Sequence, residues 1–404
     1  MDPLFLHGVD ATVVLIVLLK AVVAFAFLMV AVMFMVWFER KLIGDMQNRI
    51  GPNEAGPFGI LQTLADGVKL FFKEDLLPEK ADRRVFILAP FLALVPAFLL
   101  FAIVPIGGNF NGAHQGLVKI LGHWTFLQVA DPPIGILFVL AMSSIAVYGV
   151  MLAGWSSGSK YPLLGSVRAS AQMVSYEAAM GLTVAAVVLV SGTLSTHGMV
   201  NFQAGDGWGP IPHWNLLVAG LVPFVIFIIA GTAELNRPPF DLVEAEQELV
   251  GGFHTEYSSI RFALFFLAEF MNTVTMSAII VTLFLGGPAG PTLFGPTWMA
   301  DYIWPMVWFF GKLFVFLFMF VWFRATLPRV RYDQLMDLGW KALIPIALGW
   351  FLLLGALQLG RDQDWNPFLV MSAALVIFAV AGGLLFAAVR SARIARLEDQ
   401  EAFS

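Results

Sequence analysis

Carboxylates crowd one short segment of this chain, residues 233–259. The stretch AELNRPPFDLVEAEQELVGGFHTEYSS carries six acidic residues and a single basic residue, Arg237. If the part after the two prolines is helical, Asp241, Glu244 and Glu248 share one face. Like charges at that spacing cannot all ionise cheaply, so we expect at least one of them to hold a proton near neutral pH. Such a coupled set can pass protons through intervening water.

Aliphatic residues interleave with these acids and help to choose between two interpretations. A solvated acidic loop would carry interspersed Lys or Arg and few aliphatic residues. Instead, Leu242, Val243, Leu249 and Val250 lie among the carboxylates. Acids at membrane depth are costly and are by default candidates for function. We therefore favour a functional cluster over a solvated loop.

Two further carboxylates could extend this cluster into a buried polar path. Glu269 lies inside the apolar run FFLAEFMNTV, where a carboxylate without a purpose would be expensive. Glu177 follows Tyr176 at the predicted start of an apolar helix, where it could instead complement the helix dipole. For Lys20 and Lys312, which also fall in apolar runs, we favour a structural role, either snorkelling or contact with a partner subunit.

A basic, turn-rich segment precedes the acidic one, over residues 39–75. Its GPN and GP sequences are turn signals. Over residues 58–72, apolar residues recur with helical spacing around Asp66 and Lys69, which predicts an amphipathic helix at the membrane surface. Taken alone, Asp66 and Lys69 are interpreted as a surface pair worth a few tenths of a kcal/mol.

Three arginines gather at a membrane exit near the end of the predicted bundle. Arg324, Arg329 and Arg331 lie beside Tyr332 and Asp333. They could anchor to lipid headgroups or order the acidic segment by ion pairing.

Membrane-spanning helices must position all of these residues. The 404 residues are 59% hydrophobic and only 13% charged, with a mean hydropathy of +0.82. Because the apolar runs show no alternation of period two, we predict an all-α membrane protein, a bundle of about nine transmembrane helices. The runs span residues 12–38, 85–106, 133–153, 175–191, 216–235, 262–286, 303–323, 341–359 and 367–389.

Basic residues predict the orientation of this bundle. Nearly all of the 23 Lys and Arg residues lie in alternate loops, and only Lys119 and Arg361 lie in the opposite loops. The positive-inside rule then places the N-terminus outside and the C-terminus in the cytoplasm.

Several classes of site are disfavoured by the sequence. The chain has no cysteine, which excludes disulfides and thiolate-bound Fe–S clusters. The six histidines fall in termini or loops rather than in facing pairs within spans, which argues against haem. No phosphate-binding loop or dinucleotide fingerprint is present. We therefore expect no metal, no cofactor bound by this chain alone and no nucleic-acid partner.

Four blocks between the predicted spans resemble the signature loops of the H subunit of respiratory complex I, the proton-pumping NADH:quinone oxidoreductase. They are ERKLIGDMQNRIGPN, GWSSGSKYPLLGSVR, AELNRPPFDLVEAEQEL and RVRYDQLMDLGWK, in this order. The resemblance covers residues 30–345. It implies a multi-pass subunit of the cell inner membrane with no redox centre of its own, sharing a chamber for its substrate quinone.

The resemblance also implies partners and roles. FMN and Fe–S clusters would belong to partner subunits, namely peripheral-arm subunits with the quinone site and the clusters, beside small and antiporter-like membrane subunits and lipid. No catalytic residue is expected in this chain. The quinone chamber and its access path would involve Glu39, Arg40, Arg49, Asp66, Lys69, Arg329 and Arg331. A proton path toward the pump subunits would involve Glu177, Glu234, Asp241, Glu244, Glu246, Glu248, Glu256 and Glu269.

One departure and two rival functions complete the prediction. The family core ends after an eighth helix near Leu359, so we expect a membrane domain over 1–359 and an extension over 360–404 with a ninth helix. A membrane subunit of an energy-converting hydrogenase or F420-linked oxidoreductase would share several loop features, and a free-standing proton or cation transporter would also bury acids. The fullness of the GPN and RYDQLM blocks favours the quinone enzyme, and either ubiquinone or menaquinone fits them.

Overall fold

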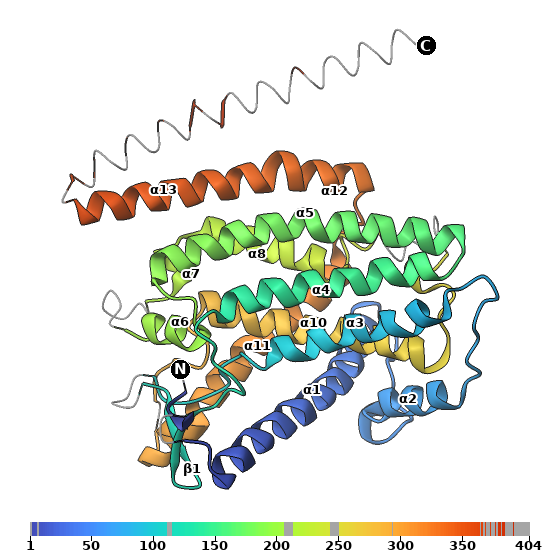
Figure 1. Ribbon diagram of the computed structural model, residues 1–404, viewed down its shortest axis with the longest axis horizontal. Helices are drawn as coiled ribbons and strands as arrows, with labels where there is room; N and C mark the ends of the chain where they lie inside the picture. The colour runs from blue at the N-terminus through green and yellow to red at the C-terminus, as the bar shows by residue number, and fades with distance from the viewer. Residues whose placement is uncertain are drawn as a thin grey trace.

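Long helices lying side by side form the molecule, as the computed structural model shows (Figure 1). The structure describes residues 2–5, 8–110, 115–205, 213–242, 250–292, 294–363, 365–366, 368, 372, 376, 379, 380, 382, 383 and 391. Over these residues the only sheet is a two-stranded hairpin. The predicted class, an all-α membrane protein, is confirmed.

Seven helices in the described part of the chain are long and apolar enough to cross a membrane. They are α1 (Ala11–Met46), α3 (Arg83–Phe101), α4 (Gly135–Ser156), α5 (Lys160–Ser191), α10 (Ser259–Phe284), α11 (Trp304–Thr326) and α13 (Ile344–Asp362). The remaining helices are α2 (Gln62–Phe72), α6 (Thr196–Gln203), α7 (Asn215–Val218), α8 (Leu221–Glu234) and α12 (Tyr332–Leu338). A π-helical turn, Gly339–Leu343, joins α12 to α13, and another, Met299–Ile303, precedes α11.

The first eight predicted apolar runs each coincide with a helix, although α8 is too short to count among the seven. Most of the predicted ninth run, 367–389, and most of the predicted extension lie outside the described residues. The surface helix expected over 58–72 is present as α2, preceded by a 3-10 turn at Pro57–Gly59.

One boundary prediction is wrong. Helix α5 begins at Lys160, so Glu177 lies in the middle of a 32-residue helix and not at its start. The polar first half of α5 is helical because its small residues pack closely: a Cβ on Gly165 would come within 2.8 Å of the Gly252 backbone. Close packing overrides the loop-like composition, and the helix-dipole interpretation of Glu177 no longer applies.

Loops gather at the two ends of the bundle, as alternating spans require. At the end that carries α2, the Asp82 amide donates to the Ser156 carbonyl at 3.0 Å and the Val330 amide donates to the Pro239 carbonyl at 3.1 Å. The opposite end carries the hairpin of β1 (Leu117–Ile120) and β2 (His123–Phe126), whose strands are antiparallel (Figure 1). Which end faces the cytoplasm stays a prediction.

The hairpin is an element that the Gly-rich connector sequence does not predict. Its turn places Leu121 and Gly122 at φ +47° and +90°. Lys20 of α1 holds it by donating to Thr125 of β2 at 2.5 Å and to Asp2 at 3.1 Å. Lys20 therefore has a structural role, with partners in its own chain.

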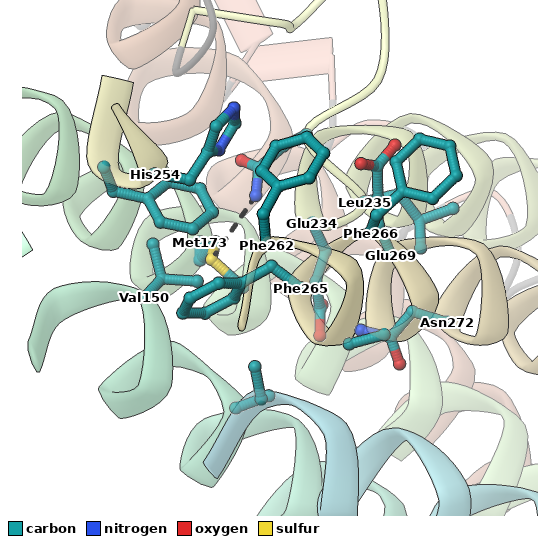
Figure 2. A pocket seen from close by; sticks show the side chains of 15 residues that line it. Val150, Met173, Glu234, Leu235, His254, Phe262, Phe265, Phe266, Glu269 and Asn272 are labelled. Atoms are coloured by element: carbon teal, nitrogen blue, oxygen red, sulfur yellow. Dashed lines mark hydrogen bonds between the residues drawn. The ribbon is translucent and has the colours of Figure 1, made fainter. Parts of the chain in front are cut away.

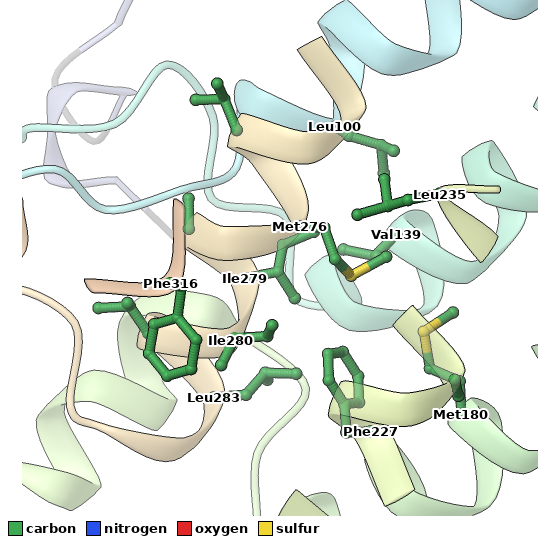
Figure 3. Packing of buried hydrophobic residues seen from close by; sticks show 14 of the residues in the cluster. Leu100, Val139, Met180, Phe227, Leu235, Met276, Ile279, Ile280, Leu283 and Phe316 are labelled. Carbon is green, nitrogen blue, oxygen red and sulfur yellow. The ribbon is translucent and has the colours of Figure 1, made fainter. Parts of the chain in front are cut away.

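Helix α10 lies at the centre of the bundle. Its most apolar stretch is 72% buried, against 17% for the stretch that includes α13. Met276, Ile279 and Leu283 of α10 pack with Phe227 of α8 in the main apolar cluster (Figure 3). A carboxylate on α10, such as Glu269, is therefore carried deep into the protein.

The far end of α10 is capped by a lysine from α11. Lys312 Nζ donates to the carbonyl oxygens of Leu285, Gly287 and Ala289 at 2.7, 2.9 and 2.8 Å. The amine also lies 5.3 Å from the centre of the Trp214 ring. The expected structural role of Lys312 thus consists of satisfying carbonyls in this chain.

We expect Lys312→Met to lower the thermal midpoint of the detergent-purified protein by roughly 5 °C or more, because each buried carbonyl left unsatisfied costs about 1–3 kcal/mol. Lys341→Met is the control, since Lys341 forms only an exposed pair with Asp337. Equal midpoints for the two variants would contradict the capping role.

Candidate functional site

A buried ion-pair cluster lies just beyond the end of α8. Arg237 is only 1% exposed, and its guanidinium donates to the Glu39 carboxylate of α1 at 2.5 Å. The same guanidinium lies 3.2 Å from the Glu269 carboxylate of α10. Arg324 of α11 pairs with the other oxygen of Glu39. Two arginines and two carboxylates thus meet where four segments converge.

Charge balance keeps this cluster in the interior. Moving charges out of water is costly, and removing one partner of a buried pair typically costs about 3–5 kcal/mol because the other charge is left uncompensated. The Phe270 ring adds a favourable contact, with the Arg237 guanidinium 4.5 Å from its centre.

Neighbouring serines of α4 hold two more carboxylates. The Ser143 hydroxyl donates to Glu234 at the end of α8, and the Ser144 hydroxyl donates to Glu177 of α5. The second carboxylate oxygen of Glu234 is buried and has no hydrogen-bond partner among the described residues. That oxygen is open to water or to a proton.

Two small cavities meet at Glu234. The first, of about 80 Å³, is also lined by Glu269, His254 and Asn272 (Figure 2). The second, of about 20 Å³, is lined by Glu234 and Asn272 together with apolar side chains. Because one water needs about 10–15 Å³ of such space, the first cavity has room for several waters and the second for about one. Glu234 can therefore contact water on two sides.

A much larger groove opens on the other side of α10. It has a volume of about 820 Å³ and lies between α1, α2 and α10. Most of its lining is apolar, and Arg40, Asp66 and Lys69 also contribute to it. Phe262 and Phe266 line both this groove and the first cavity. These phenylalanines form a shared aromatic wall between the groove and the carboxylates.

The residues predicted for the quinone chamber divide between the groove and the ion cluster. Arg40, Asp66 and Lys69 lie at the groove. Glu39 lies in the ion cluster with Glu269, although the two were assigned to different functions. The expected Asp66–Lys69 pair is not what the structure shows. Asp66 pairs with Arg40 at 2.6 Å, because α2 lies against α1.

The remaining arginines lie nearer the surface. Arg49 donates to the Gln47 side chain at 2.7 Å, beside an open hollow that Arg40 also lines. Arg331 precedes α12, and its amide donates to the Gln334 side chain at 3.2 Å. Neither side chain reaches the ion cluster.

The acidic segment is partly described. Arg329 pairs with Asp241 at 2.9 Å, as the ion-pairing interpretation of the three arginines requires. Glu256 is half-buried near the start of α10. Glu244, Glu246 and Glu248 lie outside the described residues, so the predicted shared face stays a prediction.

Four residues of the site were missed as candidates: Arg237, Arg324, Ser143 and Ser144. Arg237 carried a signal, being the one basic residue among six acids. The serine pair was visible as adjacent hydroxyls in the apolar run VLAMSSIAV. Their partners depend on tertiary contacts over many residues, such as the 91 between Ser143 and Glu234.

Two titratable groups beside the first cavity lie outside the spans. Burial lowers the pKa of His254 to about 4, so the imidazole is neutral near pH 7. Burial also raises the pKa of Tyr257 to about 12. His254 can therefore exchange hydrogen bonds with water in the cavity without adding charge. Over the residues described, no group of three or more His, Asp or Glu side chains is placed to hold a metal ion.

The fold and the site together define a multi-pass helical membrane protein with paired arginines and carboxylates in its interior. The chain belongs to the NADH dehydrogenase family, whose model matches residues 19–355. The family predicted from the four loop blocks is therefore confirmed.

Relatives at about half identity cover most of the chain, and each carries the name of the H subunit of NADH-quinone oxidoreductase. The protein of Frankia alni is 51% identical over 364 residues, which are 89% of this chain and 77% of the relative. That of Frankia casuarinae is 52% identical over 357 residues, 88% and 76% of the two chains. That of Streptomyces avermitilis is 48% identical over 371 residues, 91% and 78% of the two chains.

Burial of His254 predicts a pH dependence of stability. Its pKa in the folded protein, about 4, lies below the ordinary value of 6.5, so its neutral form stabilises the folded state. That contribution is present above pH 6.5 and is lost as the pH falls toward 4, by up to about 1.4 kcal/mol per pH unit.

We therefore expect His254→Phe to flatten the fall of the thermal midpoint between pH 6.5 and 4.5. His197, whose pKa burial also lowers to about 4, should leave part of the slope in place. The measurement is a series of melting curves at constant ionic strength. A slope unchanged from the wild type would contradict the assignment to His254.

Proposed function

We propose that this chain is the H subunit of a proton-translocating NADH:quinone oxidoreductase of the cell inner membrane. In this proposal it forms part of the quinone chamber and of the path that links quinone reduction to proton pumping. The observation that supports it most is the aromatic wall of Phe262 and Phe266, with an apolar groove on one side and a carboxylate cavity on the other.

The groove suits a quinone. An isoprenoid tail needs a long apolar surface, which the side chains of α1, α2 and α10 supply, and Arg40 and Lys69 offer polar contacts for the headgroup. Phe71 and Phe72 of α2 are 73% and 88% exposed, as expected for a helix lying at a membrane surface. A hydrophobic substrate could then enter from the lipid.

The carboxylates suit a proton path. Quinone reduced by an Fe–S cluster of a partner subunit takes up two protons, which changes the charge near the groove. Such a change alters the balance among Glu39, Arg237 and Glu269, since coupled groups respond together. Glu234, with water on both sides, would relay the response toward Glu177 and the neighbouring membrane subunits. This chain would supply no redox centre.

Assembly separates this proposal from the transporter alternative. A subunit of this enzyme should migrate on a native gel with peripheral-arm and antiporter-like membrane subunits in a very large complex, whereas a free-standing transporter should migrate alone or as a small oligomer.

A side chain placed in the groove should obstruct quinone. A Cβ on Gly67 of α2 would meet no atom within 4 Å, and Gly67 lines the groove, so Gly67→Phe can fill the groove without disturbing the fold. We expect kcat/KM for quinone in inverted vesicles to fall by about ten-fold or more, corresponding to about 1.4 kcal/mol or more. The control is Gly311→Phe, at an equally open and exposed position of α11. Equal rates in the two variants would argue against the groove as the access path.

Glu234 should be needed for coupling. Glu234→Gln keeps the shape and can still accept from Ser143, but it cannot release a proton. We expect NADH-driven quinone reduction and proton uptake in inverted vesicles to fall by about ten-fold or more while the complex stays assembled on a native gel. Glu54→Gln, at an exposed carboxylate, is the control. If both activities survive in Glu234→Gln, the buried carboxylates are structural.

A further inference from the structure

Helix α2 forms one wall of the groove, yet none of its 11 residues is buried. Isolated helices of this length are marginal in water, and most helices in proteins are held by packing of an apolar face. Because α2 has no buried face within this chain, polar contacts at its ends must fix its position.

The first end of α2 is tied to α1. Arg40 pairs with Asp66 at 2.6 Å. The Thr63 hydroxyl donates to the Met33 carbonyl at 3.2 Å, and the Trp37 indole donates to the Phe58 carbonyl, just before α2, at 2.9 Å. These contacts fix only the edge of the groove that adjoins α1.

The last turn of α2 is tied to α10 by two consecutive serines. The Ser259 hydroxyl lies within donating distance of the carbonyls of Leu70 and Lys73, at 3.1 and 2.9 Å. The Ser258 hydroxyl donates to the Glu74 carbonyl at 3.3 Å and accepts from the Leu76 amide at 2.9 Å. Two side chains thus satisfy the backbone where the helix stops.

The ion pair of Arg261 and Asp75 reinforces this junction. Its nitrogen and oxygen atoms lie 2.9 Å apart, directly beside the serine contacts. The arginine also lies over the Phe86 ring of α3, with its guanidinium carbon 5.5 Å from the ring centre. The end of α2 is therefore linked to the packed bundle as well as to α10.

Local geometry shows that the serines serve α2 in preference to their own helix. Ser258 is the N-cap residue of α10, a position where a serine hydroxyl normally accepts from the first turn, but here it makes no such bond. Ser259 has φ +55°, the left-handed region that costs a residue with a side chain about 1–2 kcal/mol. Both features direct the hydroxyls toward α2.

We propose that Ser258 and Ser259 are positioning residues that hold the end of α2 against α10 and so set the width of the groove. The inference rests on the proposed function, in which this groove admits quinone. Without the two hydroxyls, the end of α2 can move away from α10, and the apolar walls no longer lie at one fixed separation. The substrate tail then binds less tightly, whereas the chemistry at the headgroup is unaffected.

The test uses the intact complex with the double variant Ser258→Ala/Ser259→Gly. Glycine suits the positive φ of residue 259, so the change removes a hydroxyl without adding strain. Ser258→Thr keeps the hydroxyl in an extended backbone and is the conservative variant. Ser277→Ala is the matched control, since the Ser277 hydroxyl bonds only to the Thr273 carbonyl of its own helix.

Two quantities are measured. Hydrogen–deuterium exchange of residues 70–76 reports whether α2 is held. KM and kcat are measured with decylubiquinone and with long-tail quinone extracted from the same membranes. In the double variant we expect exchange to quicken by about five-fold or more, since one net hydrogen bond is worth about 1 kcal/mol. KM for the long-tail quinone should rise by a similar factor, KM for decylubiquinone should rise less, and kcat should stay within about two-fold. Ser258→Thr and Ser277→Ala should match the wild type.

The outcomes separate the two proposals. Unchanged exchange in the double variant would show that the serines do not hold α2. Faster exchange with an unchanged KM would show that they hold it without setting the groove width. Either result overturns this inference alone, provided that Gly67→Phe still obstructs quinone. If Gly67→Phe has no effect, the groove is not the access path, and both proposals fail.

Discussion

The guanidinium of Arg237 is the point on which the interior of this protein depends. It lies between the carboxylates of α1 and α10, and Arg324 of α11 completes the balance of charge. None of these groups can move away without leaving another charged and unpaired in a medium that solvates it poorly. The segment after α8 is therefore fixed, and with it Glu234, three residues earlier, whose carboxylate accepts from Ser143. Positions that look like separate candidate sites in the chain are thus one mechanical and electrostatic unit.

Helix α10 connects this unit to the surface of the bundle. Phe262 and Phe266 face both the groove and the first cavity, Glu269 and Asn272 line that cavity, and Met276 and Ile279 pack in the main apolar cluster. Because α10 is the most deeply buried of the spanning helices, it cannot tilt freely to admit a ligand. Any adjustment of the groove falls to α2, which has no buried face. A rigid wall and an adjustable wall thus face each other across one substrate-sized space.

Hydropathy predicted the helices well because a bilayer requires long apolar runs with internally bonded backbones. It failed where polar residues are helical: the first half of α5 contains serines, a lysine and an arginine, and only contacts such as Gly165 against Gly252 show why it is a helix. Single acids were also found correctly, since Glu269 stands out in an apolar run. Their partners were not, because Glu39 and Arg237 lie 198 residues apart and neither has a pattern that names the other. The hairpin was missed because its strands have only four residues each.

The thin aromatic wall has an electrostatic consequence. Phenyl rings polarise weakly and hold no water, so the field of a charge that forms in the groove would pass through Phe262 and Phe266 with little screening. At an effective dielectric constant of about 20, two unit charges about 8 Å apart interact by about 2 kcal/mol. That would shift a protonation equilibrium more than ten-fold without moving any helix. Information about what occupies the groove could therefore arrive at the carboxylates as a potential, faster than any rearrangement of the fold.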